Sequence, residues 1–281
     1  MSETTAASYW SDERAAKWLA GVARMEAGLA PVDGPLIDAL ALDRAYRIVD
    51  VGCGGGGTTL EVARRAPGGS VVHGYDLSRA LVDWANGREQ ARERGVRFRV
   101  ADMQREAPPE ALYDRMVSRF GVMFFPDPPA AFANLCRWVA PGGRFAFAVW
   151  GPLEENVWMT SVRDAVGGLV EAPRLDSEGP GAFRYAETDR FRGLLETAGW
   201  SEVAVREWRG DLAIGGGLRA RPAAEFALGS FSSFSELLGG PESDLFQRAC
   251  ESLTARFVES ERDGAVTLQA HVRIVTGVRR A

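Results

Sequence analysis

Lysine is almost absent from this chain of 281 residues: Lys17 is the only one, and arginine supplies the rest of the 33 basic residues. The shortage excludes several enzyme classes. A phosphate loop ending in Gly-Lys-Ser or Gly-Lys-Thr, the Tyr-x-x-x-Lys pair of short-chain dehydrogenases and a central lysine for pyridoxal phosphate all require lysine. The arginine excess also suggests a GC-rich bacterial genome.

Cysteine and histidine are scarce as well. Cys53, Cys136 and Cys250 form no C-x-x-C pair, and the two histidines, His73 and His271, lie far apart in the sequence. The sequence offers few of the cysteine and histidine ligands that a zinc site requires, and the cysteine spacing implies no disulfides. We therefore expect no metal site.

Long hydrophobic runs are missing, although hydrophobic residues make up 46% of the chain. No segment approaches the ~20 apolar residues that a membrane helix requires, and residues 1–8 lack the basic and apolar regions of a signal peptide. The net charge is −5, and no cluster of basic residues is dense enough to follow a phosphate backbone. We expect a cytoplasmic enzyme, monomeric or homodimeric, that binds neither membranes nor nucleic acid.

Glycine, in contrast, is concentrated in residues 52–57. The stretch follows a β-branched segment, residues 46–51, that is typical of a strand, and precedes a segment with helical character, residues 58–66. Glycines in such a turn allow positive φ angles and a close approach of the backbone to a ligand. The pattern of strand, glycine turn and helix predicts a nucleotide-binding loop.

Charge separates two interpretations of this loop. Gly52, Gly54 and Gly57 satisfy the G-x-G-x-x-G spacing of dinucleotide-binding proteins, but Asp50 would repel a pyrophosphate bound at the helix N-terminus. The D-x-G-x-G-x-G spacing, which adds Gly56, resembles the loop of class I S-adenosylmethionine (SAM) dependent methyltransferases. SAM carries an ammonium and a sulfonium, and an acid such as Asp50 suits this cationic ligand. The resemblance implies SAM as cofactor and S-adenosylhomocysteine as product.

Two further acids follow predicted strands. Asp76 comes directly after the second strand, residues 70–75, where an acid can accept hydrogen bonds from both ribose hydroxyls. Its alternative role is to cap the next helix, for which Ser78 is equally suited. Asp102 follows the third strand, residues 96–100, and the resemblance implies that it meets the adenine amine while its apolar neighbour meets the ring. The alternative for Asp102 is a solvent-exposed turn.

The fourth predicted strand extends the resemblance. Ser118-Arg119-Phe120, together with Pro141-Gly142-Gly143-Arg144, resembles methyltransferases related to ubiquinone and menaquinone biosynthesis, and the likeness covers about residues 46–150. Within the loop, Cys53 has the character of a small apolar filler. The cofactor-binding residues that the resemblance implies are Asp50, Gly52, Cys53, Gly54, Thr58, Asp76, Leu77, Ala101, Asp102, Met103, Ser118, Arg119 and Phe120.

Alternating strands and helices indicate an α/β fold. The resemblance implies a Rossmann-like sheet of seven strands, mostly parallel with an antiparallel last strand, and helices on both faces. We expect four regions: an N-terminal helical lid (1–42), a SAM-binding core (43–150), a substrate-cap insertion (151–187) and a segment that completes the core (188–281), with a helical insertion at about 215–264.

The insertions are rich in aromatic residues, so the predicted acceptor is a small, largely apolar or aromatic metabolite of secondary or quinone-type metabolism. Methylation could occur at O, N or C. The catalytic residues stay unknown, because a neutral amine needs no general base whereas a phenol or alcohol gains from one. Two alternatives are a protein of this fold that binds cofactor without methyl transfer, as scaffold or pericyclic-type catalyst, and an NAD(P)-dependent oxidoreductase.

Overall fold

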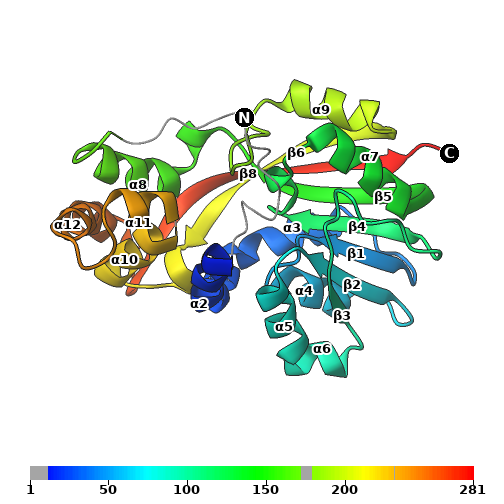
Figure 1. Cartoon of the computed structure of the whole chain (residues 1–281), viewed down its shortest axis with the longest axis horizontal. Coiled ribbons are helices and arrows are strands. Elements are labelled where there is room, and N and C mark those ends of the chain that lie inside the picture. The colour runs from blue at the N-terminus through cyan, green and yellow to red at the C-terminus, as the bar shows by residue number, and fades with distance from the viewer. Residues whose placement is uncertain (1–11, 172–178, 231) are drawn as a thin grey trace.

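A mixed β-sheet forms the centre of the computed structural model, which describes residues 12–171, 179–230 and 232–281 (Figure 1). The strands lie in the order β3-β2-β1-β4-β5-β8-β6. Residues 1–11 of the predicted lid and residues 172–178 of the predicted cap lie outside the described residues. The strands are β1 (Arg47–Val51), β2 (Val71–Asp76), β3 (Arg97–Val100), β4 (Tyr113–Arg119), β5 (Val139–Trp150), β6 (Trp200–Ala213), β7 (Glu261–Arg262) and β8 (Ala265–Arg279).

Neighbouring strands from β3 to β5 are parallel, whereas β8 runs antiparallel to both β5 and β6. The predicted seven-stranded, mostly parallel sheet with an antiparallel last strand is confirmed, with one addition. The two-residue strand β7 pairs with β8 beside the main path. Apolar side chains fill the central strands, as expected where helices cover a parallel sheet on both faces.

Helices surround this sheet, and several short 3₁₀ turns join them. Those around the parallel half are α2 (Asp12–Leu29), η1 (Ala30–Val32), α3 (Asp33–Asp38), α4 (Gly57–Arg65), α5 (Arg79–Gly87), α6 (Glu89–Glu93), η2 (Val122–Phe124) and α7 (Pro128–Trp138). Those in the second half are η3 (Leu153–Glu155), α8 (Val157–Gly167), α9 (Thr188–Thr197), η4 (Ile214–Gly216), α10 (Ala220–Ser230), α11 (Ser232–Leu237) and α12 (Asp244–Glu259). Within the described ranges, no helix is both long and apolar enough to cross a bilayer.

Strands β6 and β8 are much longer than their neighbours on the parallel side. The sequence predicts a strand over residues 201–208, but β6 continues to Ala213 because it pairs with β8 along nearly its whole length, from Trp200↔Arg279 to Ala213↔Thr267. Figure 1 shows the two strands running from the core to the group of helices α8, α10, α11 and α12. This long ribbon carries the insertion helices beyond the end of the parallel sheet.

The sequence predicts one helix from Ser78 to Gly95, but the structure divides it into α5 and α6. Arg88 adopts an extended backbone, with φ −69° and ψ 135°, and separates α5 from α6. Its guanidinium donates one hydrogen bond to the Gly55 carbonyl and one to the Glu26 carboxylate. These contacts with the glycine loop and with α2 hold Arg88 in its extended conformation.

Pro31 and Pro35 predict a linker between two helices, but helical structure continues through both prolines. Helix α2 passes directly into η1 and then α3. Pro31 lies in the first turn of η1, where its missing N–H leaves no hydrogen bond unmade. The chain therefore turns from α2 to α3 without a loop.

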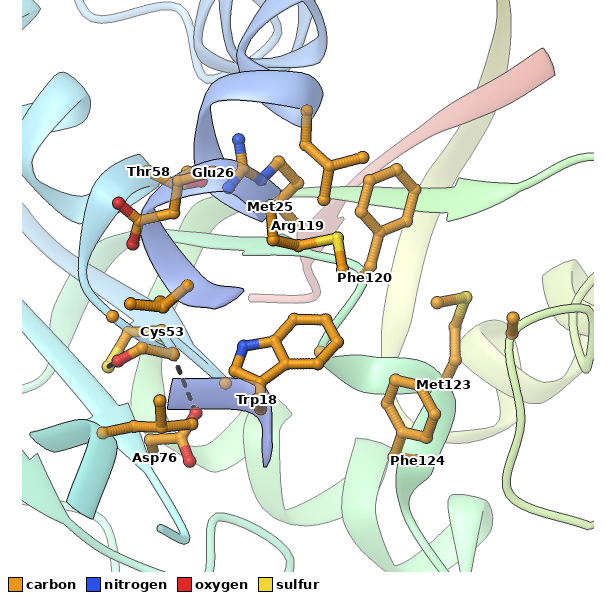
Figure 2. Close-up of a pocket in the computed structure, with 18 of the residues that line it drawn as sticks. Trp18, Met25, Glu26, Cys53, Thr58, Asp76, Arg119, Phe120, Met123 and Phe124 are labelled. Carbon is orange, nitrogen blue, oxygen red and sulfur yellow. Dashed lines mark hydrogen bonds between the residues drawn. The ribbon is translucent and has the colours of Figure 1, made fainter. Parts of the chain in front are cut away.

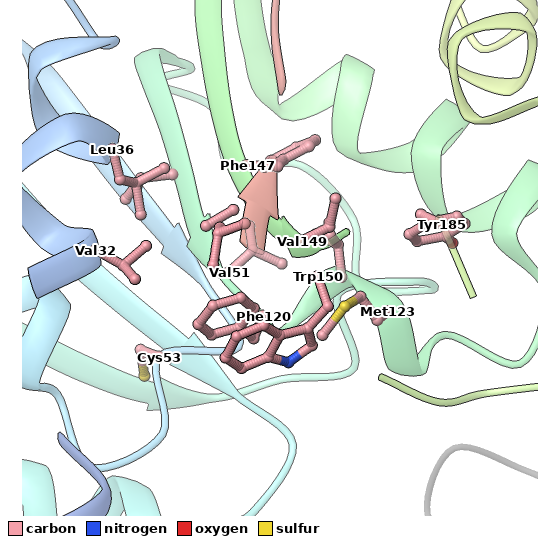
Figure 3. Close-up of a cluster of buried hydrophobic side chains, with 14 of the residues drawn as sticks. Val32, Leu36, Val51, Cys53, Phe120, Met123, Phe147, Val149, Trp150 and Tyr185 are labelled. Atoms are coloured by element: carbon pink, nitrogen blue, oxygen red, sulfur yellow. The ribbon is translucent and has the colours of Figure 1, made fainter. Parts of the chain in front are cut away.

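The hydrophobic core continues from the sheet to the carboxyl ends of β4 and β5 (Figure 3). Phe145 and Phe147 of β5 are fully buried, and at the strand end Trp150 stacks on Phe120 with centroids 4.2 Å apart and planes 7° from parallel. Phe120 has a φ angle of +64°, which is uncommon for a bulky residue. This turn directs the ring toward the edge of the sheet where ligands of open α/β folds bind.

Candidate active site

A cavity of about 270 Å³ opens at this edge of the sheet. Its walls come from the segments that follow β1, β2, β3 and β4, from α2 and from the second half of the chain. Every residue of the predicted cofactor-binding set except Ser118 lines it. Figure 2 shows Cys53 and Asp76 at one end of this cavity, and Met123 and Phe124 at the other.

The glycine loop forms the floor of the first end. Gly52, Gly54 and Gly56 have φ angles of +68°, +54° and +86°, which favour glycine strongly. A Cβ on Gly52 would lie 2.9 Å from the Cα of Gly121, whereas one on Gly54 would meet no atom within 4 Å. The loop thus packs tightly against Gly121, in the turn between β4 and η2, and leaves open space at Gly54, where a ligand fits.

Asp50 lies beneath this loop and is almost fully buried. Its Oδ2 accepts a hydrogen bond of 2.6 Å from the Thr59 hydroxyl, but its buried Oδ1 has no partner among the described residues. Burial raises the pKa of Asp50 to about 7, and the Thr59 bond opposes this shift. A buried carboxylate oxygen without a donor on the lining of a cavity fits the cationic end of SAM.

Asp76 is held at the end of β2 by backbone amides. Gly54 N donates to its Oδ2 and Ser78 N to its Oδ1, each at 2.9 Å. Burial raises the pKa of Asp76 while these amide donors lower it. Ser78, and not Asp76, caps the next helix: its hydroxyl accepts a hydrogen bond from Leu81 N at the start of α5. Asp76 is therefore oriented by the glycine loop and lines the cavity.

Asp102 forms a turn after β3 that is half-buried rather than open to solvent. Its Oδ1 accepts from Gln104 N at 3.0 Å, and its neighbours Ala101 and Met103 are buried. Asn134 of α7 fixes this turn by donating to the Met103 carbonyl at 2.9 Å. The pattern of an acid beside apolar side chains matches what an adenine ring requires.

Two members of the predicted set are tied to Asp33, which the sequence analysis did not find. Arg119 Nη1 lies 2.9 Å from Asp33 Oδ2, and Thr58 Oγ1 donates to Asp33 Oδ1 at 2.9 Å. The side chains of Arg119 and Asp33 are 9% and 10% exposed, so the ion pair is well shielded from solvent. Burial raises the pKa of Asp33, and Arg119 opposes that shift. The pair neutralises the arginine charge beside the cavity.

Glu26 of α2 is a second residue that the sequence analysis missed. Gly57 N, in the first turn of α4, donates to its Oε1 at 2.9 Å, and Arg88 Nη1 donates to its Oε2 at 2.8 Å. A Cβ on Gly57 would lie 2.7 Å from Glu26 Cδ, so this glycine permits the close approach of α2. The carboxylate occupies the helix N-terminus that binds phosphate in dinucleotide-binding folds.

The other end of the cavity is apolar and aromatic. Trp150, stacked on Phe120, also contacts Trp158 of α8 at a centroid distance of 4.8 Å. These three rings form a wall that we call the aromatic wall. Further apolar side chains line the cavity, contributed by α2, η2, β6, η4 and α10: Trp18, Met25, Met123, Phe124, Leu212, Ile214 and Phe226.

Several polar residues considered from the sequence lie elsewhere. Ser118 is fully buried and its Oγ donates to the Val51 carbonyl at 2.6 Å, so it joins β4 to β1 behind the cavity. His73 bonds to the Tyr113 hydroxyl, and burial lowers the pKa of His73 to about 4. His271 pairs with Glu207 on the long ribbon. Neither histidine lines the cavity.

Comparison with known proteins gives the family. A family model described as a methyltransferase domain matches residues 48–143. The demethylmenaquinone methyltransferase of Thermus thermophilus is 34% identical over 178 residues, which cover 58% of this chain and 78% of that protein. The nocamycin O-methyltransferase of Saccharothrix syringae is 32% identical over 218 residues, 71% of this chain and 72% of that protein.

The fold has a matching solved structure. The YcgJ protein of Bacillus subtilis superposes with a TM-score of 0.56 over 89% of this chain and 98% of its own, at 15% sequence identity, a likeness that shows the fold alone. With the sequence relatives above, the family is clear: this chain belongs to the class I SAM-dependent methyltransferases. The predicted family, enzyme class and cofactor are thereby confirmed.

Proposed function

We propose that this protein transfers the methyl group of SAM to an O, N or C atom of a small, largely apolar or aromatic metabolite. The observation that carries the proposal is the two-part cavity. A glycine loop with Asp50, Asp76 and Asp102 lines one end, and the aromatic wall lines the other. A nucleoside cofactor and an apolar acceptor can therefore meet in one cavity.

We assign the parts of the cofactor to three strand ends. Asp50, with its unpaired buried Oδ1, suits the ammonium group. Asp76, which the Gly54 and Ser78 amides orient, suits the two ribose hydroxyls. Asp102 and the buried Met103 suit the adenine amine and ring face. Each assignment pairs the chemistry of a ligand group with the side chain at the matching strand end.

A nicotinamide dinucleotide suits this site poorly. Its pyrophosphate would need the N-terminus of α4, but the carboxylate of Glu26 already accepts the Gly57 amide there. Asp50 adds a second negative group below the loop. Two carboxylates at an anion-binding position support a cofactor without phosphate.

When bound, SAM supplies an electrophilic methyl group on a sulfonium. The contribution of this chain is to hold the acceptor atom in line and to exclude water. Placement of this kind can lower a barrier by about 7 to 11 kcal/mol, and the apolar rings of Phe120, Trp150 and Trp158 favour a reaction in which charge is dispersed. No histidine lines the cavity in the part of the chain that the structure describes, and we assign no general base.

Isothermal titration calorimetry tests the cofactor assignment. We expect S-adenosylhomocysteine to bind and NAD to give no heat of binding. The reverse result would overturn the proposal. Incubation with labelled SAM and an extract of the source organism, followed by mass spectrometry, then identifies what gains a methyl group. Tight cofactor binding with no methylated product would favour a scaffold or pericyclic-type catalyst instead.

A further inference from the structure

We propose that Asn156 is a positioning residue, which holds Trp158 in the aromatic wall and thereby makes the site selective for a flat aromatic acceptor. The inference rests on the proposed function and deepens it. Asn156 precedes α8 in the segment that follows β5, and it does not itself line the cavity. Nothing in the sequence pattern distinguishes it from an ordinary helix-capping residue.

The side-chain amide of Asn156 is fully buried and uses all of its hydrogen-bonding groups. Its Oδ1 accepts from His271 N at 3.0 Å and from Trp158 Nε1 at 3.3 Å. Its Nδ2 donates to the carbonyls of Pro152 at 2.8 Å and Gly151 at 3.5 Å. Because two N–H groups point at one end and two carbonyls at the other, only one orientation of the amide satisfies them.

These bonds connect three parts of the chain. Gly151 and Pro152 follow β5, His271 belongs to β8, and Trp158 belongs to α8. A Cβ on Gly151 would lie 2.4 Å from the His271 ring, so the glycine lets the two segments close around Asn156. The amide is therefore anchored to the sheet, and the indole of Trp158 is anchored to the amide.

Trp158 in turn completes the aromatic wall. Its ring is tilted 49° to that of Trp150, which lies flat on Phe120. Phe183 lies on another side of it, with centroids 6.3 Å apart. The N–H bond to Asn156 fixes the rotation of the half-buried indole about its side-chain torsions, because a hydrogen bond is more directional than a ring contact. A fixed ring plane favours flat aromatic partners over flexible aliphatic ones.

The clean variant is Trp158→Phe, which keeps an aromatic ring and removes the N–H donor. Trp208→Phe is the matched control, since Trp208 lies on β6 and does not line the cavity. The probe is 2-naphthol, titrated by calorimetry into protein saturated with S-adenosylhomocysteine. We expect Trp158→Phe to weaken 2-naphthol binding about two- to tenfold and to change S-adenosylhomocysteine affinity less than about twofold. We expect Trp208→Phe to match the wild type in both.

Asn156→Ala supplies a measurement that does not depend on the acceptor. In a ¹⁵N–¹H spectrum, the indole N–H signal of Trp158, identified by its loss in Trp158→Phe, should shift in Asn156→Ala while that of Trp208 stays in place. The double variant that combines Trp158→Phe with Asn156→Ala should bind 2-naphthol no more weakly than Asn156→Ala alone, because each change removes the Asn156–Trp158 hydrogen bond and that bond can be lost only once.

Three results separate the possible failures. If Trp158→Phe binds 2-naphthol with the affinity of the wild type, the proposed role of Asn156 is wrong. The role is also wrong if the Trp158 indole signal does not shift in Asn156→Ala. If the wild type binds S-adenosylhomocysteine but not 2-naphthol, the flat aromatic acceptor class is wrong. If S-adenosylhomocysteine itself fails to bind, the proposed function falls, and the Trp158 signal still reports whether Asn156 holds the indole.

Discussion

The two ends of the cavity are built by different means. At the end proposed for the cofactor, hydrogen bonds from backbone amides orient the carboxylates: Gly54 N donates to Asp76, and Gly57 N donates to Glu26. At the acceptor end, side chains from widely separated segments meet, such as Phe120, Trp150 and Trp158. The first end depends on local backbone geometry and charge, and the second on packing and on one buried amide.

This difference explains which end a sequence pattern can reveal. A loop that needs positive φ angles must carry glycines at fixed spacing, so its signature is short and contiguous. A wall assembled from β4, β5 and α8 has no such spacing, because tertiary packing alone brings its members together. A variant at one end should therefore weaken the binding of one ligand and leave the affinity for the other nearly unchanged. The largest effects are expected at the glycine loop and the smallest behind the cavity.

Gly52→Ala should have the largest effect, and it should fall on the cofactor end. The residue has a φ angle of +68°, and a Cβ would lie 2.9 Å from Gly121 Cα. A non-glycine residue in this region costs about 1 to 2 kcal/mol before the clash is added. We expect S-adenosylhomocysteine affinity to fall by more than about 100-fold and the melting temperature to drop. Gly68→Ala, with no atom within 4 Å, is the control and should change neither.

Asp76→Ala should weaken S-adenosylhomocysteine binding about 10- to 100-fold, because charged hydrogen bonds contribute about 1.5 to 3 kcal/mol each. The chain should stay folded and its affinity for 2-naphthol should change little. Asp127→Ala is a matched control: Asp127 caps α7 through Ala130 N, so its loss should lower stability by about 1 kcal/mol without affecting the cofactor. Unchanged cofactor affinity in Asp76→Ala would contradict the ribose assignment.

Asp50→Asn should make the folded protein more stable at high pH but weaken its binding of the cofactor. Burial raises the pKa of Asp50 from 3.8 to about 7, so the folded state holds this proton more tightly than the unfolded chain between those values. The contribution of Asp50 to stability therefore falls as the pH rises through this range. At pH 8 we expect Asp50→Asn to raise the melting temperature by about 2 to 4 °C, measured by calorimetry.

The same substitution should weaken cofactor binding. For the wild type, S-adenosylhomocysteine affinity should decline as the pH falls below about 7, because protonation removes the charge that Asp50 offers to the ammonium. Asp50→Asn should lose about tenfold in affinity at pH 8 and show a flatter pH profile. An unchanged profile in this variant would exclude Asp50 as the titrating group.

Phe226→Leu tests an apolar side chain that the second half of the chain contributes to the cavity. Phe226 of α10 lines the cavity, and its ring lies beside Gly21 of α2. Replacing the ring with an aliphatic side chain should weaken 2-naphthol binding about two- to fivefold and leave S-adenosylhomocysteine affinity within twofold of the wild type. Equal losses for both ligands would show that the two ends are not independent.

Ser118→Ala should have the smallest effect. Ser118 Oγ donates to the Val51 carbonyl behind the cavity, so its loss should lower the unfolding free energy by about 1 kcal/mol, measured by urea denaturation. Affinity for S-adenosylhomocysteine should stay within twofold. A tenfold loss would instead support the cofactor contact that the family resemblance implies for Ser118.

Much of the fold followed from short-range pattern. The strand before Gly52 and the positions of Asp76 and Asp102 after predicted strands depend on hydrophobic runs and on residues next to them in sequence. The antiparallel last strand was expected from the family resemblance alone. The full length of β6 was not predicted from local pattern, because its last residues include a glycine and the exposed Arg209 and Asp211, which pair with β8 in register. Backbone pairing to a long partner overrides the weak local preference of those residues.

The unpredicted site residues share a different cause. Glu26 meets Gly57, and Asp33 meets Arg119, through contacts that cross 31 and 86 positions of sequence. Their neighbourhoods carry only helical periodicity, which says which face is buried and nothing about a distant partner. Asn156 is similar, since its bonds to His271 span 115 positions. Ion pairs and buried amides of this kind emerge only when the chain has folded.

The carboxylate of Glu26 has a consequence for selectivity among nucleotides. SAM shares its adenosine group with ATP, NAD and coenzyme A. Unlike SAM, these three molecules carry phosphate groups. An enzyme that recognised only the adenosine group would be inhibited by these nucleotides. Because the Glu26 carboxylate accepts the Gly57 amide, this N–H group at the start of α4 is already bonded and does not offer a free donor to the phosphate of a competing nucleotide.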